Sequence, residues 1–392
     1  MTGRSDVLIN DFAGHPFQFD LAVGLFRRGF DVHHAYCSTN VTPHASFDDV
    51  GVSIHPISTG RGFDKYRPVR RLVGELTYGL KSAGLLARLR PSVAISSNVP
   101  LFSLALVSIA CSILRVRHVL WLQDLQSGLA TLAQRRRIGR TLTLLEGWLI
   151  RRAFRVVAIS DDFRTAAIRL GARSDRVEVI ENWAPLNEMP VRPRHNAWSR
   201  AHDLDDRFVF LYSGTLGLKH RPELLLALAE TFECDKAVRV VVVSEGAGAD
   251  WLKAELTARP QPNMVVLPFQ PFEQLADVLA SADVLVSLLD PAAGRFSVPS
   301  KVLSYLCAAR PILAAMPSEN AASRLIVERA QAGVNVPTAD PSDLAAAAVG
   351  LRRDAEARTR FGRQAREYAE KAFAIGPIVE RFTQIAQLEE QA

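Results

Sequence analysis

Cysteine is scarce in this chain of 392 residues, and the patterns that depend on it are missing. The four cysteines lie far apart, with no Cys-x-x-Cys pair and no histidine cluster near them (Cys37, Cys111, Cys234 and Cys307). This spacing argues against a zinc site and against a disulfide framework. We therefore expect the chain to work in a reducing compartment, the cytoplasm.

The sequence offers little that could enter or cross a membrane. The stretch Val99–Leu114 is uncharged for 16 residues, but a spanning helix needs about 20, so we predict a buried core helix there. The first residues are polar and reach only a short strand-like run, so no signal peptide is expected. Low-complexity tracts and short repeats are also missing.

Composition and length favour two globular domains. Hydrophobic residues make up 48% of the chain and charged residues 22%, which excludes the composition of a disordered protein. A chain of this length is expected to form two cores of roughly 200 residues each.

The net charge of +6 is unevenly distributed. Residues 1–190 hold 24 Lys and Arg against 16 Asp and Glu, whereas residues 191–392 hold 23 against 25. The basic first half suits phosphates, an anionic membrane surface or nucleic acid. Nucleic acid is not expected, because the basic residues follow no recognised binding motif and are not interleaved with aromatic residues.

Short apolar runs alternate with helical stretches along the whole chain. The first half contains strand-like runs at 7–10, 32–37, 92–96, 118–123 and 155–160, and the second half at 208–214, 239–246, 263–269 and 284–290. This alternation predicts an α/β protein with parallel sheets and crossover helices. Prolines between Pro185 and Pro193 interrupt the pattern. We predict a first Rossmann-like domain at 1–190, a linker at 191–205, a second Rossmann-like domain at 206–372 and a closing helix at 373–392 that returns to the first domain.

Three strand-to-helix loops could hold a phosphate. Gly14, beside His15, can bring backbone N–H groups close to an anion. Lys219 follows Gly214 and Gly217 near the start of a helix, and Lys301 follows Pro299 in a similar place. Each loop also has a structural interpretation: a turn that needs glycine, a solvated lysine, or a core helix that begins at proline.

An ordered set of motifs resembles one enzyme family. The set is GHPFQFDLAVGLFRRGF, LWLQDLQS, VVAISDDFR, SGTLGLKH, VVSEGAG, LPFQPFEQLADVL and PSKVLSYLCAARPIL. It resembles family 4 glycosyltransferases, in particular the bacterial surface-polysaccharide branch with a PSK motif that includes fucosamine-type transferases. The likeness extends over nearly the whole chain.

The resemblance implies a GT-B fold, with two Rossmann-like domains facing a central cleft. It also implies retaining transfer from a nucleoside-diphosphate sugar, usually UDP-linked, to a glycan or polyprenyl-diphosphate-linked acceptor. The residues it implies at the donor are Gly14, Gly214, Lys219, Glu245, Gly246, Phe269, Gln270, Pro299, Ser300, Lys301 and Ser304. Phe296 and Ser304 stand where many members carry glutamates. Thr215 or a neighbour stands where many carry an arginine before the phosphate lysine, so Lys301 is expected to supply the missing cation.

The catalytic candidates are Lys219, His15 and Asp124. Cations can stabilise a leaving diphosphate without a metal, so neither a metal nor a cofactor is expected. Asp124 follows a strand and could position the acceptor hydroxyl, although aspartate there could also cap a helix. Glu146 is expected on a solvated helix face. Asp203 and Asp205 form an Asp-x-Asp motif, but they precede a strand and are not expected to bind metal.

Two other functions remain open from the sequence. One is a sugar-nucleotide epimerase of GT-B fold, which should need more carboxylates or histidines in its cleft. The other is a nucleotide-binding subunit that has lost its chemistry, because the two glutamates are missing. The sugar, the base, the acceptor and the oligomeric state are not evident.

A basic helix is predicted within residues 67–90. At 100° per residue its cations fall within one arc: Arg67, Arg70, Arg71, Lys81 and Arg88. Val69, Leu72, Val73, Leu76, Leu80 and Ala83 fall on the other side, which is expected to pack on the domain. The cationic face could rest on an anionic membrane, as could the cluster Arg135, Arg136, Arg137 and Arg140. We therefore expect a cytoplasmic protein that can associate with the inner face of the membrane.

Overall fold

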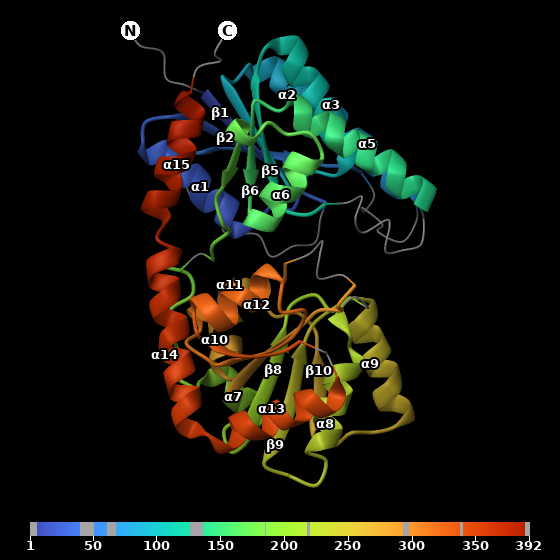
Figure 1. Ribbon diagram of the computed structural model, residues 1–392, viewed down its shortest axis with the longest axis vertical. Helices are drawn as coiled ribbons and strands as arrows, with labels where there is room; N and C mark the ends of the chain where they lie inside the picture. The colour runs from blue at the N-terminus through green and yellow to red at the C-terminus, as the bar shows by residue number, and fades with distance from the viewer. Residues whose placement is uncertain are drawn as a thin grey trace. The chain divides into compact units, whose positions relative to one another are not determined.

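The structure, a computed structural model, describes residues 6–39, 51–60, 68–125, 136–184, 186–217, 220–292, 298–337 and 340–388. The chain divides into two compact units (Figure 1). Unit 1 comprises residues 1–182 together with 375–392, and unit 2 comprises residues 183–374. Each unit is a parallel α/β layer structure, which confirms the predicted fold class of two Rossmann-like domains.

Unit 1 is built on a seven-stranded sheet in the order β3-β2-β1-β4-β5-β6-β7. All its strand pairs are parallel. The strands are β1 (Asp6–Asp11), β2 (Asp31–Cys37), β3 (Ser53–Ile57), β4 (Val93–Ser97), β5 (Arg117–Leu122), β6 (Arg155–Ala158) and β7 (Val177–Val179). β4 is buried along its whole length, as expected for a strand covered by helices on both faces.

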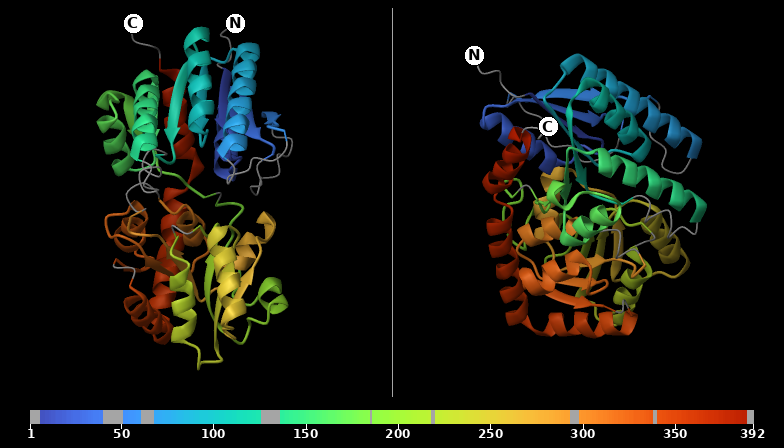
Figure 2. Two further views of the ribbon diagram at one scale, coloured as in Figure 1. Left: turned by 90° about the vertical axis from the view of Figure 1, so that its right-hand side faces the viewer. Right: turned by 45° about the horizontal axis from the view of Figure 1, so that its top comes forward.

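Helices cover both faces of this sheet. They are α1 (Pro16–Arg27), α2 (Pro68–Leu89), α3 (Leu101–Leu114), α5 (Arg136–Arg152), α6 (Asp161–Arg169) and α15 (Ile375–Gln387). α2, α3 and α5 lie side by side on one face, and α1 packs with α15 on the other (Figures 1 and 2). The α1–α15 contact is close: a Cβ on Gly24 would lie 2.2 Å from Cγ2 of Val379.

Unit 2 contains a six-stranded parallel sheet in the order β10-β9-β8-β11-β12-β13. Its strands are β8 (Phe208–Ser213), β9 (Val238–Val243), β10 (Met264–Leu267), β11 (Val284–Leu288), β12 (Ile312–Ala315) and β13 (Gly333–Val336). Its helices are α7 (Ala197–Ala201), α8 (Glu223–Thr231), α9 (Ala247–Ala258), α10 (Leu275–Ala280), α11 (Lys301–Cys307), α12 (Ala321–Arg324), α13 (Pro341–Arg353) and α14 (Ala355–Ala372). β8, β9 and β11 supply much of the core.

The segment 191–205 is folded onto unit 2. Arg194 forms an ion pair with Asp283 at 3.1 Å, and its guanidinium also donates to the carbonyls of Leu204 and Arg207. The side chain of Asn196 caps α7 and donates to the carbonyl of Asp277 at 3.0 Å. These bonds tie the proline-rich region to the beginning of the sheet of unit 2.

The packed face of α2 differs from the one predicted. Leu72, Val73, Leu76 and Leu80, expected to pack on the domain, are exposed. The buried face instead carries Gly74, Glu75, Tyr78, Gly79, Ser82, Leu85 and Leu86. The reason is close helix packing against α3: a Cβ on Gly79 would lie only 2.8 Å from Cα of Ser103. The small side chains, rather than the leucines, therefore form the contact.

The core-helix prediction for Val99–Leu114 is also only half right. α3 packs between α2 and α5, but Phe102, Ile109 and Ile113 point to solvent while Ser103 and Ser108 are buried. Among the described residues, no helix combines the length and the apolar character that membrane crossing requires.

Candidate functional site

Lys301 and Gly214 meet at the carboxyl ends of the strands of unit 2. Gly214 directly follows β8 and has a φ of +127°, a conformation open to glycine and strained for other residues. A Cβ at Gly214 would lie 3.2 Å from Cε of Lys301, so the lysine stem runs directly over this glycine. Ligands of parallel α/β sheets bind at this edge, which makes the pair a candidate phosphate site.

Tyr212 holds the side chain of Lys301, and Tyr305 holds the helix that carries it. The Lys301 ammonium lies 3.6 Å from the ring centroid of Tyr212 and donates a hydrogen bond to the phenol oxygen. The Tyr212 phenol in turn donates to the carbonyl of Thr215 at 3.0 Å. Tyr305 accepts a hydrogen bond from the N–H of Ser213 at 2.9 Å and so ties α11 to the end of β8. Burial raises the pKa of both phenols above the usual range, so both act as neutral hydrogen-bonding groups.

The loops after β8 and β9 are joined by hydrogen bonds. The hydroxyl of Ser244 donates to the carbonyl of Gly214 at 2.7 Å, and the N–H of Leu216 donates to the carbonyl of Glu245 at 3.1 Å. Gly246 begins α9 with a φ of +111°. The structure therefore brings Gly214, Glu245, Gly246 and Lys301 to one edge of unit 2, with the Glu245 side chain exposed.

The remaining predicted donor residues of unit 2 fall into two groups. Phe269 and Gln270 follow β10 at the same edge of the sheet, and Gln270 accepts a hydrogen bond from the indole of Trp198 at 3.2 Å. Pro299 and Ser300 precede Lys301, and Ser304 is one turn later, half-buried. Lys219 and Phe296 lie outside the described residues.

The helix that begins at Lys301 is shorter than its motif suggests. α11 has 7 residues, and the side chain of Ser300 makes no capping hydrogen bond. The dipole of so short a helix is small, so any donor contact here depends on the Lys301 side chain and on the glycine loops.

In unit 1, the loop containing Gly14 is closed onto a buried carboxyl group. Asp11, at the end of β1, accepts hydrogen bonds from the N–H groups of Ala13 at 3.1 Å and His15 at 2.6 Å. Burial raises the pKa of Asp11 to about 7, although these N–H donors oppose the shift. Gly14 has a φ of +73°, as the turn requires. Two of the backbone N–H groups in this loop, which was expected to bind a phosphate, therefore donate to Asp11 instead.

His15 extends an aromatic chain from this loop. Its ring stacks on Phe17 at 5.7 Å, and Phe17 meets Trp121 of β5 edge-on at 5.6 Å. His15 thus lies in the loop before α1, as predicted from the sequence, and the residue is half-buried.

Unit 1 also has a cavity of about 370 Å³ at the carboxyl ends of β1, β4 and β5. Asp124 and Glu146 both line it, together with Arg71 of α2. The prediction that Glu146 lies on a solvated helix face is wrong: it is 6% exposed, because this side of α5 faces the cavity. Most of the other lining is apolar, including Leu101, Leu104, Leu149 and Ile150. Such a cavity fits a ligand with apolar and hydroxyl groups.

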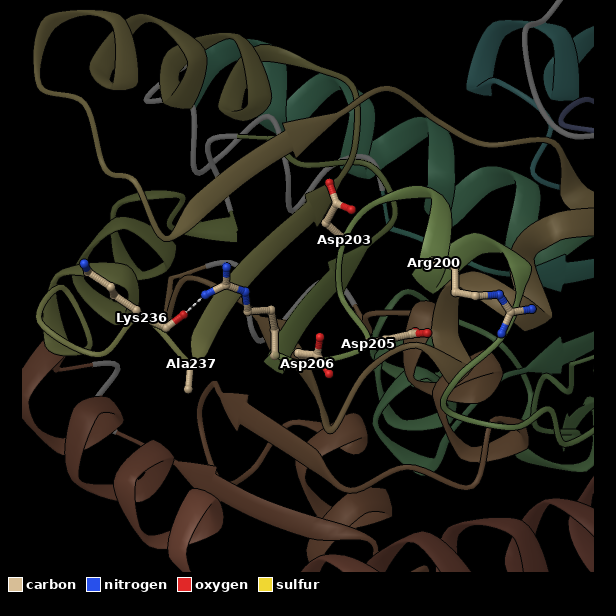
Figure 3. Close-up of a pocket in the computed structure, with 7 residues that line it drawn as sticks. Arg200, Asp203, Asp205, Asp206, Lys236 and Ala237 are labelled. Carbon is tan, nitrogen blue, oxygen red and sulfur yellow. Dashed lines mark hydrogen bonds between the residues drawn. The ribbon is translucent and has the colours of Figure 1, made fainter.

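The Asp-x-Asp motif lies elsewhere, in a hollow of about 470 Å³ before β8 (Figure 3). In Figure 3 the carboxyl groups of Asp203, Asp205 and Asp206 do not converge. Asp205 accepts a hydrogen bond from the Ser199 hydroxyl and lies 3.4 Å from Nδ1 of His195. Within the described residues, no group of three or more His, Cys, Asp or Glu is placed to hold a metal ion.

Both units match known protein families. Residues 16–183 match the family described as "Glycosyl transferase 4-like domain", and residues 207–354 match "Glycosyl transferases group 1". The chain thus contains a glycosyl transferase 4-like domain and a glycosyl transferases group 1 domain. The cavity with Asp124 and Glu146 lies in the 4-like domain, and the cluster around Lys301 lies in the group 1 domain.

Curated relatives match over part of their length. The chain is 26% identical over 203 residues to "Putative colanic acid biosynthesis glycosyl transferase WcaI" of Escherichia coli (strain K12), covering 48% of this chain and 49% of the relative. It is 28% identical over 208 residues to "Probable glycosyltransferase WbjE" of Pseudomonas aeruginosa, covering 53% and 51%. The matched region thus spans about half the length of each relative.

A solved structure matches over almost the whole chain. The crystal structure of Anabaena Alr3699/HepE in complex with UDP-glucose has a TM-score of 0.72 at 16% identity, covering 97% of this chain and 99% of that chain. At this identity the likeness concerns the fold, and it confirms the predicted GT-B class.

Several residues of these sites were not identified from the sequence. Tyr212 and Tyr305 lie within apolar runs, where a tyrosine is normally read as core. Asp11 ends a strand and precedes a glycine turn, a position where aspartate often bonds the backbone, so this signal was available. His220, which accepts a hydrogen bond from the N–H of Gly217 at 3.0 Å, gave no signal beyond its place in the SGTLGLKH motif.

Proposed function

We propose that this protein is a glycosyltransferase that moves a sugar from a UDP-sugar to a glycan or lipid-linked acceptor, with retention at the anomeric carbon. The observation that carries the proposal is the joining of Gly214, Glu245–Gly246 and Lys301 at one edge of the group 1 domain. The UDP-glucose held by a protein of the same fold supports the choice of donor.

Unit 2 supplies the chemistry that a leaving diphosphate needs. In the transfer, the bond from the anomeric carbon to the diphosphate oxygen breaks and its electron pair stays on that oxygen, while the acceptor oxygen bonds to the carbon and loses its proton. The ammonium of Lys301 neutralises the charge that grows on the diphosphate. Its contact with the neutral Tyr212 holds it in place before the donor binds. Lys219 is proposed as a second cation.

Unit 1 offers the site for the acceptor. The cavity lined by Asp124 and Glu146 carries two carboxylates that can orient or deprotonate a hydroxyl, within apolar walls. An acceptor carried on a polyprenyl diphosphate would match such walls and would place the reaction in surface-polysaccharide synthesis, the context named for WcaI.

The decisive experiment incubates the purified chain with radiolabelled UDP-sugars and an extract of bacterial lipids. We expect the label to move to lipid. NMR of the product should show the same anomeric configuration as in the donor. Label that stays on a nucleotide carrying a different sugar would instead show an epimerase, and tight UDP-sugar binding without turnover would show an inactive subunit.

The same assay tests the metal requirement. We expect activity to persist in EDTA, because the proposed charge stabilisation comes from lysines. Loss of activity in EDTA that added Mg²⁺ or Mn²⁺ restores would contradict this part of the proposal.

A further inference from the structure

Exposed apolar side chains are concentrated on one layer of unit 1. Of the twelve large hydrophobic residues that are exposed in the described part of the chain, eight belong to α2, α3 and α5. We call these eight the outer helix face: Leu72, Val73, Leu76, Leu80, Phe102, Ile109, Ile113 and Leu144. Leu80, Ile113 and Leu144 are 63%, 75% and 72% exposed, values unusual for side chains of this size.

The three helices are adjacent, so the eight residues share one surface. α3 packs between α2 and α5, and the three helices lie in a row in front of the sheet in the left view of Figure 2. On α3, Phe102, Ile109 and Ile113 are spaced by seven and four residues and fall on one stripe. A contiguous apolar surface on a soluble fold marks a contact with another phase or another molecule.

These helices bury several apolar side chains, but they also place small polar residues inside and large apolar residues outside. α3 buries Ser103 and Ser108 while Ile113 faces solvent, and the Ser103 hydroxyl is satisfied by the carbonyl of Glu75 at 2.5 Å. On α2, Gly79 and Ser82 are on the buried side and Leu80 is on the exposed side. Serines inside and large apolar side chains outside depart from the pattern of a helix whose outer side meets water.

The charges exposed on the same helices are all positive. Their exposed ionised side chains, among those described, are Arg70, Arg71, Lys81, Arg88, Arg140, Arg151 and Arg152. The two acidic residues in these helices, Glu75 and Glu146, are 3% and 6% exposed. On α5, Leu144 lies on one stripe with Arg140 and Arg151, so cations border the apolar residues.

We propose that the outer helix face inserts into the surface of an anionic lipid membrane. Leucine and isoleucine side chains would enter the boundary between headgroups and acyl chains, and the arginines would bind phosphates at headgroup depth. A protein partner would need an acidic surface around an apolar centre, whereas a bilayer with anionic lipids offers both features everywhere. The proposal does not rest on the transfer reaction, because it concerns binding alone.

Co-sedimentation of the full chain with liposomes tests the proposal without any substrate. One liposome set is phosphatidylcholine alone, and the other contains 30 mol% phosphatidylglycerol, roughly the range in which polybasic surfaces respond. We expect binding to the anionic liposomes that is at least tenfold stronger, weakens in 0.5 M salt and yet leaves a detectable fraction bound, because insertion is not screened.

Paired variants separate insertion from charge attraction. Leu80→Gln combined with Ile113→Gln should reduce binding at least tenfold even at low salt, because both side chains are solvent-exposed and the fold does not depend on them. Ile168→Gln on α6, also exposed, is the control and should bind as the original protein does. Arg70→Gln with Arg88→Gln should abolish the preference for anionic liposomes, whereas Arg164→Gln on α6 should not.

Three results would overturn the proposal. One is no binding to either liposome set at low salt. Another is unchanged binding of the Leu80→Gln, Ile113→Gln variant, which would leave attraction by charge alone. The third is a stable dimer in light scattering that the same variant dissociates while liposome binding stays absent, which would make the outer helix face an interface between two copies.

Discussion

At the scale of single residues, the proposed donor site depends on how one lysine is held. The ammonium of Lys301 contacts the face of Tyr212 and its stem crosses Gly214, so the side chain has little freedom to lose when a ligand binds. A cation fixed in this way stabilises developing charge without reorganising, which is the property that transition-state stabilisation requires.

Replacement of Lys301 by alanine is therefore expected to remove about 2 to 4 kcal/mol of transition-state stabilisation while the fold stays intact. This loss corresponds to a fall in kcat/KM of roughly 30- to 900-fold. Lys253→Ala, which removes an exposed lysine from α9, is the matched control and should leave kcat/KM unchanged. Steady-state kinetics with a UDP-sugar measure both. Turnover by a folded Lys301→Ala protein at the original rate would show that Lys301 has only a structural role.

The two carboxylates of the unit 1 cavity give a separate prediction. Asp124→Asn and Glu146→Gln should each lower kcat by tenfold or more, with little change in UDP affinity, because their proposed partner is the acceptor. Glu230→Gln on α8 is the exposed control. Rate measurements combined with calorimetric titration of UDP give the two quantities. A parallel fall in UDP affinity and rate for either variant would indicate that the residue only supports the fold.

At the scale of elements, sequence patterns located the strands better than they assigned faces. β1, β4, β5 and β6 were predicted because each contains a short apolar run, and β2 was predicted from the run VHHAYC. Four strands were missed, β3 and β7 in unit 1 and β12 and β13 in unit 2. β3 contains His55 and Pro56, and the other three have only 3 or 4 residues each. The packed face of α2 was misjudged because apolar periodicity assumes that leucine is buried. Gly79 and Ser103, which decide this contact, carry no apolar signal.

The contact between α2 and α3 can be tested with two glycines of one helix. Gly79→Ala should lower the free energy of unfolding by about 1 to 3 kcal/mol, because the new methyl group would lie 2.8 Å from Cα of Ser103. Gly84→Ala should raise it by about 0.5 to 1 kcal/mol, since nothing lies within 4 Å of its Cβ position and alanine favours helix. Urea denaturation followed by circular dichroism measures both.

Effects of the same sign at the two glycines would contradict this account of helix packing. In that case the close approach of Gly79 to Ser103 could not be what sets the face that α2 buries.

At the scale of the whole molecule, the order of elements specified both units, but the sites needed the tertiary structure. The motif PSK pointed to Lys301, yet only the fold shows Tyr212 beneath its ammonium. Asp124 was identified from its position after a strand. Glu146 lines the same cavity, but it lies on α5, a different element, and its sequence position did not indicate this. Long-range neighbours of this kind leave no trace in local spacing.

The stability of unit 1 is expected to rise with pH between about 4 and 6.5. Burial lowers the pKa of His34 to about 3 and that of His118 to about 4, from 6.5, so in this window both bind protons only when unfolded. Burial raises the pKa of Asp11 from 3.8 to about 7, so its carboxyl binds a proton only when folded. Counting these three groups, the unfolded state therefore holds a net one proton more, which corresponds to about 1.4 kcal/mol per pH unit. Burial also lowers the pKa of His55, which adds to the slope in the same direction.

Two substitutions should move this slope in opposite directions. His118→Gln removes one of the protons gained on unfolding and should lower the slope by about 1.4 kcal/mol per pH unit. Glutamine can still bond the Ser96 hydroxyl that His118 contacts at 2.9 Å. Asp11→Asn removes the opposing carboxyl and should raise the slope by about 1.4 kcal/mol per pH unit. Hydrogen exchange of unit 1 peptides across urea series at several pH values reports the slope for this unit alone. An unchanged slope in Asp11→Asn would mean that Asp11 is ionised in the folded protein, with the N–H groups of Ala13 and His15 outweighing its burial.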